Sequence, residues 1–107
     1  MYTNPVIFCD YSDPDVIYAN GTYFLVASSF NFTPGLPILA SKNLVNWKLV
    51  NYALENIPAS RFAYPQNSQG IWAPSFCHHN GKYYIIVGMP DEGIFITESD
   101  NILGTWS

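Results

Sequence analysis

The sequence is poor in basic residues. Its 107 residues contain four Lys and Arg against eight Asp and Glu, which gives a formal net charge of −4. A chain with so few cations has little with which to neutralise a phosphate backbone, so we expect no nucleic-acid partner. A neutral ligand such as a sugar is compatible with this charge.

Metal-binding patterns are also missing. The two cysteines, Cys9 and Cys77, do not form a Cys-x-x-Cys pair. We predict two reduced, half-buried thiols, and the alternative is a disulfide between them. The adjacent His78 and His79 would point to opposite faces of a strand and would chelate one ion poorly, so we assign them a structural role and predict no metal ligands.

Long apolar segments are absent as well. No stretch approaches the roughly 20 residues that span a bilayer. The N-terminus, Met1–Pro5, lacks the basic segment and apolar run of a signal peptide. We therefore expect no membrane partner and a cytoplasmic location.

Aromatic residues are abundant. Eight Tyr, seven Phe and three Trp make up 17% of the chain, and 49% of the residues are hydrophobic. This composition supports a packed core and favours β-structure. It also suits proteins that stack on the flat faces of ligands.

An internal repeat with a spacing of about 60 residues runs through the chain. Asn20–Tyr23 recurs as Asn80–Tyr83, and Ser41–Leu44 recurs as Ser99–Ile102. Each Asn-Gly pair predicts a type I′ hairpin turn, because both residues tolerate positive φ. A repeated pattern in one order indicates two copies of one supersecondary unit.

Each unit has the signals of short antiparallel strands, with hairpin turns and no helical period. A four-stranded unit of this length predicts a propeller blade, and the alternative is a two-sheet sandwich. The segment Tyr52–Gly70 between the units is predicted to be a long loop of the kind that often contributes to binding sites. The predicted strands are Asp15–Ala19, Thr22–Ser29, Leu36–Ser41, Trp47–Asn51, Ser75–His79, Lys82–Val87 and Ile94–Glu98.

Two blades do not close a ring. We place blade one at about residues 13–51 and blade two at about residues 72–107. Their outer edges and faces would be exposed, so we expect this chain to be part of a larger domain that requires the remaining blades.

The candidate catalytic residue is Asp13, which precedes Pro14. A residue before proline is pushed towards extended geometry, which would fix the direction of the Asp13 side chain as a catalytic carboxylate requires. If the strand is regular, Asp15 lies on the same face, where it orients Asp13 or caps a turn. The alternative for the Asp-Pro-Asp sequence is an Asx-type turn without a catalytic role.

Two aromatic residues are candidates for substrate binding. Ala73-Pro74 aligns with Asp13-Pro14 in the repeat, so the equivalent of the carboxylate is Ala73, preceded by Trp72, and the second blade offers an aromatic wall. Phe30 lies in the predicted loop after the second strand. A sugar needs both a charged group near its anomeric carbon and an aromatic surface for its C–H face. The alternatives are a core role for Trp72 and a hydrophobic plug under the loop for Phe30.

Taken together, these motifs resemble glycoside hydrolase family 43, which contains β-xylosidases and α-L-arabinofuranosidases. The resemblance covers essentially the whole chain. Asn43 departs from the family, in which Asp is common at that position. The motifs are Asn4–Ile7, Asp13–Ile17, Asn20–Phe24, Ser28–Phe30 with Pro34-Gly35, Ser41–Trp47 and Gly70–Pro74.

The resemblance implies an all-β, five-bladed β-propeller that hydrolyses glycosidic bonds of plant cell-wall type oligosaccharides with inversion. Asp13 matches the general base, and Phe30 and Trp72 match residues that line the pocket. No cofactor is implied, although some members hold a calcium ion in the central channel.

In this family the general acid is a Glu and a further Asp tunes it, both from later blades. Glu55, Glu92 and Glu98 do not match the position of the acid. We therefore expect the chain by itself to be inactive. The alternative function is a non-catalytic propeller that binds glycans, and a weaker one is a related five-bladed family that acts on fructans or mannosides.

Overall fold

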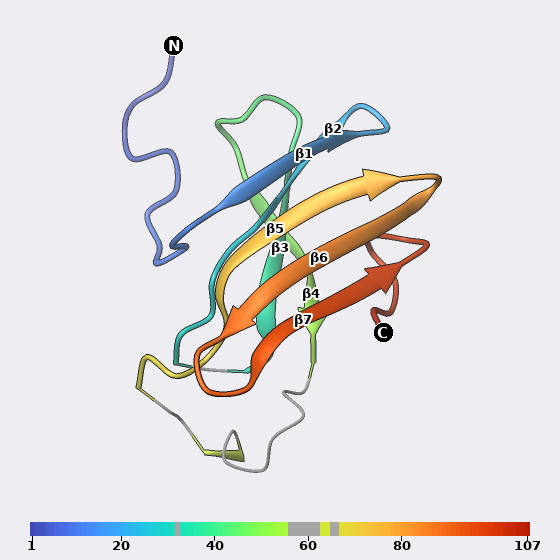
Figure 1. The fold of residues 1–107 in the computed structure, drawn as a ribbon. Helices are drawn as coiled ribbons and strands as arrows, with labels where there is room; N and C mark the ends of the chain where they lie inside the picture. The colour runs from blue at the N-terminus through green and yellow to red at the C-terminus, as the bar shows by residue number, and fades with distance from the viewer. Residues whose placement is uncertain (32, 56–62, 65–66) are drawn as a thin grey trace.

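The computed structural model describes residues 1–31, 33–55, 63–64 and 67–107. The described residues form seven strands in two antiparallel sheets, with the order β1-β2-β3-β4 in the first and β5-β6-β7 in the second (Figure 1). They contain no α-helix, and no helix among them is long and apolar enough to cross a membrane. The strands are β1 (Asp15–Ala19), β2 (Thr22–Val26), β3 (Gly35–Ser41), β4 (Lys48–Leu54), β5 (Trp72–His79), β6 (Lys82–Met89) and β7 (Gly93–Ser99).

The predicted strands and hairpin turns are confirmed, with shifts at some ends. Asn20 and Gly21 have φ of 51° and 74°, and Asn80 and Gly81 have 49° and 78°, as type I′ turns require. β2 ends at Val26, earlier than predicted. β4 extends to Leu54, so the expected loop over Tyr52–Gly70 begins later, and its residues 56–62 and 65–66 lie outside the described residues.

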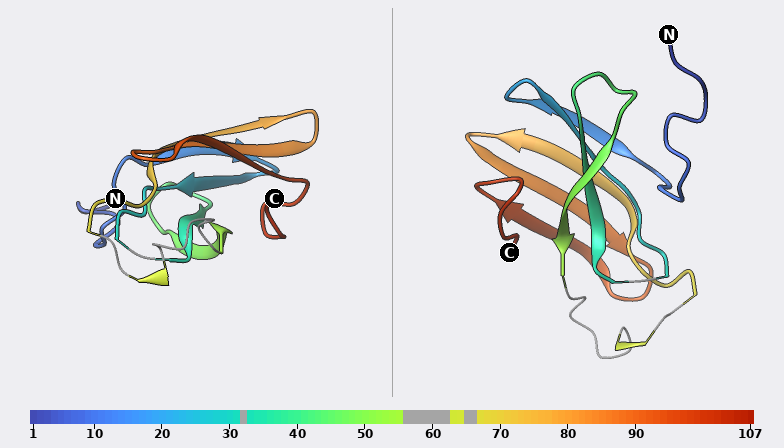
Figure 2. Two further views of the ribbon diagram at one scale, coloured as in Figure 1. Left: turned by 60° about the horizontal axis from the view of Figure 1, so that its bottom comes forward. Right: turned by 180° about the vertical axis from the view of Figure 1, so that it is seen from behind.

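The two sheets are stacked as layers with an apolar core between them (Figure 2). Ile71, directly before β5, is fully buried in this core. The first sheet contributes Phe24, Val26, Leu36, Ile38 and Ala53, and the second contributes Phe76, Tyr83, Ile85, Val87 and Met89.

The outer face of the second sheet is apolar and exposed. Ile86, Ile94 and Ile96 are 44%, 83% and 63% exposed. In the repeat they correspond to Val26, Leu36 and Ile38, which the first sheet buries against the second. The second sheet therefore presents the surface that a further sheet would cover. A two-sheet sandwich would leave a polar outer face, so this observation contradicts the sandwich alternative.

The outer face of the first sheet is covered by the N-terminal segment. Ile7 and Tyr11 pack against a small cluster of Leu25, Ala27 and Leu39. Burial raises the pKa of the Tyr11 hydroxyl.

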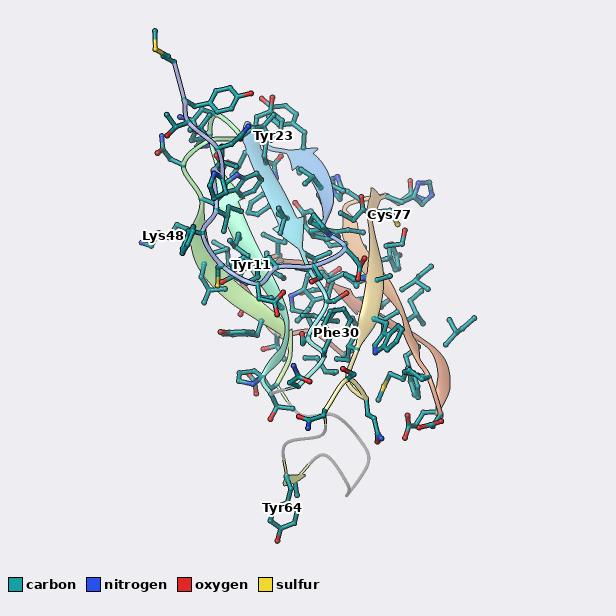
Figure 3. All side chains as sticks on the ribbon, turned by 90° about the vertical axis from the view of Figure 1, so that its left-hand side faces the viewer. Tyr11, Tyr23, Phe30, Lys48, Tyr64 and Cys77 are labelled. Atoms are coloured by element: carbon teal, nitrogen blue, oxygen red, sulfur yellow. The ribbon has the colours of Figure 1, made fainter. Side chains whose placement is uncertain are left out.

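Both cysteines are free, as predicted, but they are exposed rather than half-buried. Cys9 lies in the N-terminal segment, and Cys77 alternates with the buried Phe76 on β5 and so faces away from the core (Figure 3).

Gly70 makes a close backbone contact that excludes a side chain. Its amide donates to Phe30 O at 2.9 Å, and a Cβ on Gly70 would lie 2.1 Å from Ser29 O. We expect Gly70→Ala to lower the free energy of unfolding by about 1–3 kcal/mol, because the backbone must move apart. Gly88→Ala is the matched control, since a Cβ there meets no atom within 4 Å. Denaturant unfolding of both variants measures the difference, and equal stabilities would contradict this prediction.

Candidate functional site

Asp13 lies at the bend that leads into β1, and its side chain is exposed. Asp13 Oδ2 accepts a hydrogen bond from Ser28 Oγ at 3.0 Å. The predicted extended backbone is wrong, because Asp13 has a φ of 49° in the left-handed region. Aspartate tolerates this region better than most residues, and the contact with Ser28 holds the side chain in place after the turn. Ala73, its counterpart in the repeat, bends in the same way with a φ of 40°.

Ser28 links this carboxylate to the second sheet. The Ala73 amide donates to Ser28 Oγ at 2.8 Å, and the Ser28 amide donates to Ser12 O at 3.0 Å. The Ser28 side chain is buried. Sequence reasoning included Ser28 only as part of a motif, since nothing in the local pattern indicates a contact with a residue 45 positions later.

Phe30 and Trp72, the two predicted aromatic residues, are brought into contact. Their ring centroids are 5.6 Å apart in a T-shaped arrangement with an interplanar angle of 80°. Figure 3 shows Phe30 where the chain leaves β2, beside the beginning of β5. Trp72 remains 44% exposed, so part of its ring is accessible to a ligand.

Asp15 hydrogen-bonds to the second sheet, and among the residues that the structure describes no hydrogen bond joins it to Asp13. Asp15 Oδ2 accepts a hydrogen bond from the Phe76 amide at 2.8 Å, and Oδ1 accepts one from the Val16 amide at 2.9 Å. The bond from Phe76 ties β1 to β5, which lie side by side in Figure 1, whereas the bond from Val16 is local to β1. Asp15 therefore joins the sheets and does not orient the candidate base.

No group of three His, Cys, Asp or Glu side chains in the described part of the chain is arranged to hold a metal ion. His78 stacks on Tyr83 with ring centroids 4.4 Å apart, which supports its structural role. The Glu98 carboxylate accepts a hydrogen bond from Lys82 Nζ at 2.7 Å, and this bond raises the pKa of the Lys82 amine. Calcium in the channel stays a prediction.

An open groove of about 470 Å³ continues from Trp72 along the connection between β6 and β7. The site thus combines the exposed Asp13 carboxylate, the Phe30 and Trp72 rings and an apolar groove. None of these side chains and none of the groove residues is cationic, so they offer no positive charge to an acidic ligand. This combination suits a neutral ligand with hydroxyl groups and an apolar face. The groove is lined by Ser68, Trp72, Gly88, Met89, Pro90, Gly93 and Ile94.

Comparisons with known proteins identify the family of the chain. The model of the family described as glycosyl hydrolases family 43 matches residues 2–107. A non-reducing end α-L-arabinofuranosidase of Bacteroides ovatus is 34% identical over 99% of this chain and 21% of its own length. A β-xylosidase of Bacillus subtilis is 32% identical over 98% of this chain and 21% of its own length. The chain thus spans about a fifth of the length of these curated relatives.

Solved structures give the same result. The GH43 BlXynB protein from Bacillus licheniformis aligns with a TM-score of 0.86 and 30% identity, over 99% of this chain and 23% of that chain. An α-L-arabinanase of Cellvibrio cellulosa, 23% identical, shares the fold with a TM-score of 0.70. The predicted all-β, five-bladed propeller fold is confirmed, and the chain covers a small N-terminal portion of it.

The bond between Asp15 and Phe76 provides a stability test. We expect Asp15→Ala to lower the free energy of unfolding by about 1–3 kcal/mol, because the Phe76 amide loses its partner. Asp15→Asn keeps an oxygen acceptor and should lose less than half as much. Thermal or denaturant unfolding distinguishes the two variants, and equal losses would mean that the hydrogen bond to Phe76 is not the source of the effect.

Proposed function

The chain belongs to the glycosyl hydrolases family 43, and we propose that the protein containing it hydrolyses O-glycosidic bonds in plant cell-wall type oligosaccharides. Relatives named β-xylosidase and α-L-arabinofuranosidase support terminal xylose or arabinofuranose as the released sugar. The observation that carries the proposal is the exposed Asp13 carboxylate, linked through Ser28 to the backbone that also carries Trp72. The oligosaccharide is the partner, and the remaining blades complete the domain.

Asp13 is the general base of an inverting reaction in this proposal. Its Oδ2 is held by Ser28, and among the described residues no group hydrogen-bonds to its Oδ1. Oδ1 is therefore free to accept a proton from water. The water oxygen bonds to the anomeric carbon as the bond from that carbon to the leaving oxygen breaks, and the proton of the water passes to Asp13.

The leaving oxygen takes a proton from a general acid, which we assign to a carboxyl group of a later blade. Inversion requires this group to lie about 6.5–9.5 Å from the base, so that a water molecule fits between substrate and Asp13. Glu98 does not fit this role, because it is paired with Lys82. The chain by itself then has a base without an acid and is inactive.

Phe30 and Trp72 form the wall of the pocket in this proposal. The edge-to-face contact fixes both rings, and the exposed part of Trp72 offers an apolar face for sugar C–H groups. Asp13 and Phe30 come from the first blade and Trp72 from the second, so the contact between the sheets positions the wall relative to the base.

We expect Asp13→Ala in the full-length protein to lower the hydrolysis of aryl β-xylosides or α-L-arabinofuranosides by about 10²- to 10⁴-fold, because the base is lost. Sodium azide should restore turnover and yield a glycosyl azide, since azide attacks without needing to lose a proton. Asp15→Asn is the matched control, because the hydrogen bonds of Asp15 within the described part of the chain come from backbone amides, and we expect it to keep most of the activity.

Retained hydrolysis in Asp13→Ala would contradict the role of the base. A folded full-length protein that binds xylo-oligosaccharides and cleaves neither class of aryl glycoside would favour a non-catalytic glycan-binding propeller instead.

Loss of the aromatic wall should weaken transition-state binding. We expect Trp72→Ala to lower kcat/KM by about 10- to 100-fold, because the sugar loses a stacking surface. Trp47→Phe is the control, since Trp47 packs against the cluster on the outer face of the first sheet. Steady-state kinetics give kcat/KM for both variants. Equal values would contradict the assignment of Trp72 to the substrate pocket.

A further inference from the structure

The Ser28 hydroxyl contacts both blades beside the candidate base. The Ala73 amide can only donate, so Ser28 Oγ accepts at 2.8 Å. An ionised carboxylate can only accept, so the Ser28 proton points to Asp13 Oδ2 at 3.0 Å. The direction of this short chain of hydrogen bonds is therefore fixed. Ser28 is 4% exposed, so water does not compete readily for its hydroxyl.

The repeat provides an internal comparison for this contact. Ser12 and Ser28 are joined by a backbone hydrogen bond, and their counterparts Trp72 and Gly88 are paired across β5 and β6. Asp13, which follows Ser12, and Ala73, which follows Trp72, both have a positive φ, and each is followed by proline. The second unit forms this bend with Ala73 and Gly88, without a carboxylate or a hydroxyl.

The bend therefore does not require a hydroxyl at the position of Ser28. The serine occurs in the unit that carries the carboxylate, and the other unit lacks both groups. A purely structural role for the Ser28 side chain would be expected in both units, whereas a role that serves Asp13 is expected in the first unit alone.

We infer that Ser28 is a positioning residue for Asp13, an inference that rests on the proposed hydrolase function. The hydroxyl holds Oδ2 and so directs Oδ1 towards the nucleophilic water. Through Ala73 it also sets the distance between the base and the backbone that carries Trp72. Misplacement of a catalytic group by about 1 Å can cost about 100-fold in rate.

The test uses Ser28→Ala and Ser28→Gly in the full-length enzyme, the second of which introduces the residue found at position 88. We expect kcat to fall by about 10- to 100-fold and KM to change by less than about twofold, because the base acts in the chemical step. Ser99→Ala is the control: its buried hydroxyl bonds to the backbone oxygens of Asn101 and Thr105. The Ser99→Ala substitution should leave kcat unchanged.

A double-variant cycle separates positioning from a structural role. If Ser28 acts through Asp13, the pair Asp13→Ala with Ser28→Ala should show the same azide-supported rate as Asp13→Ala alone. An azide-supported rate that falls by the factor seen for Ser28→Ala would overturn the inference, because the hydroxyl would then be acting on the pocket itself.

Two other results would also overturn the inference about Ser28 while leaving the proposed hydrolase function intact. One is an unchanged kcat in Ser28→Ala alongside an inactive Asp13→Ala. The other is loss of the folded state in both Ser28 variants, measured by thermal unfolding, since the hydroxyl would then be needed for the fold. Failure of the proposed function has a different signature, namely no hydrolysis by the wild type or full hydrolysis by Asp13→Ala, and it would remove the basis of the inference too.

Discussion

A pair of backbone hydrogen bonds between Ser29 and Ile71 positions the rest of the site. Each amide donates to the carbonyl of the other residue at 2.9 Å, which joins the segment that follows β2 to the residue directly before β5. Ile71 is fully buried as a result, and the residues on either side of the bridge are set against one another. Phe30, which follows Ser29, contacts Trp72, and Ser28, which precedes Ser29, accepts a hydrogen bond from the Ala73 amide. The candidate site is therefore held by a contact between sheets and not by a single loop.

The repeat explains how a nearly symmetric scaffold carries an asymmetric site. Both units have a left-handed bend before proline near the beginning of their first strand: Asp13 precedes β1, and Ala73 is the second residue of β5. The first unit uses this bend to present a carboxylate, and the second uses it to present an indole ring one residue earlier. Since both bends have a positive φ before proline, the groups they present differ through their side chains. The apolar outer face of the second sheet continues the same pattern towards further blades.

Much of this architecture could be predicted from the sequence, because its signals are local. The Asn-Gly turns and the alternating strands depend on neighbouring residues, and their recurrence after about 60 residues indicated two copies of one blade. The placement of Phe30 and Trp72 in one pocket followed from the family resemblance. The left-handed backbone of Asp13 did not follow, because the preference of a residue before proline was overridden by the bend into β1. The contacts of Ser28 with Ala73 and of Asp15 with Phe76 were also missed, since they join residues 45 and 61 positions apart.

The anomeric configuration of the first product tests the central claim most directly. Proton NMR of the full-length protein acting on an aryl β-xyloside or α-L-arabinofuranoside resolves the sugar before it equilibrates in water. If Asp13 activates water from the face opposite the leaving group, the first sugar to appear has the configuration opposite to that of the substrate. A first product with the configuration of the substrate would contradict this account, because Asp13 would then act as a nucleophile or not take part in the reaction.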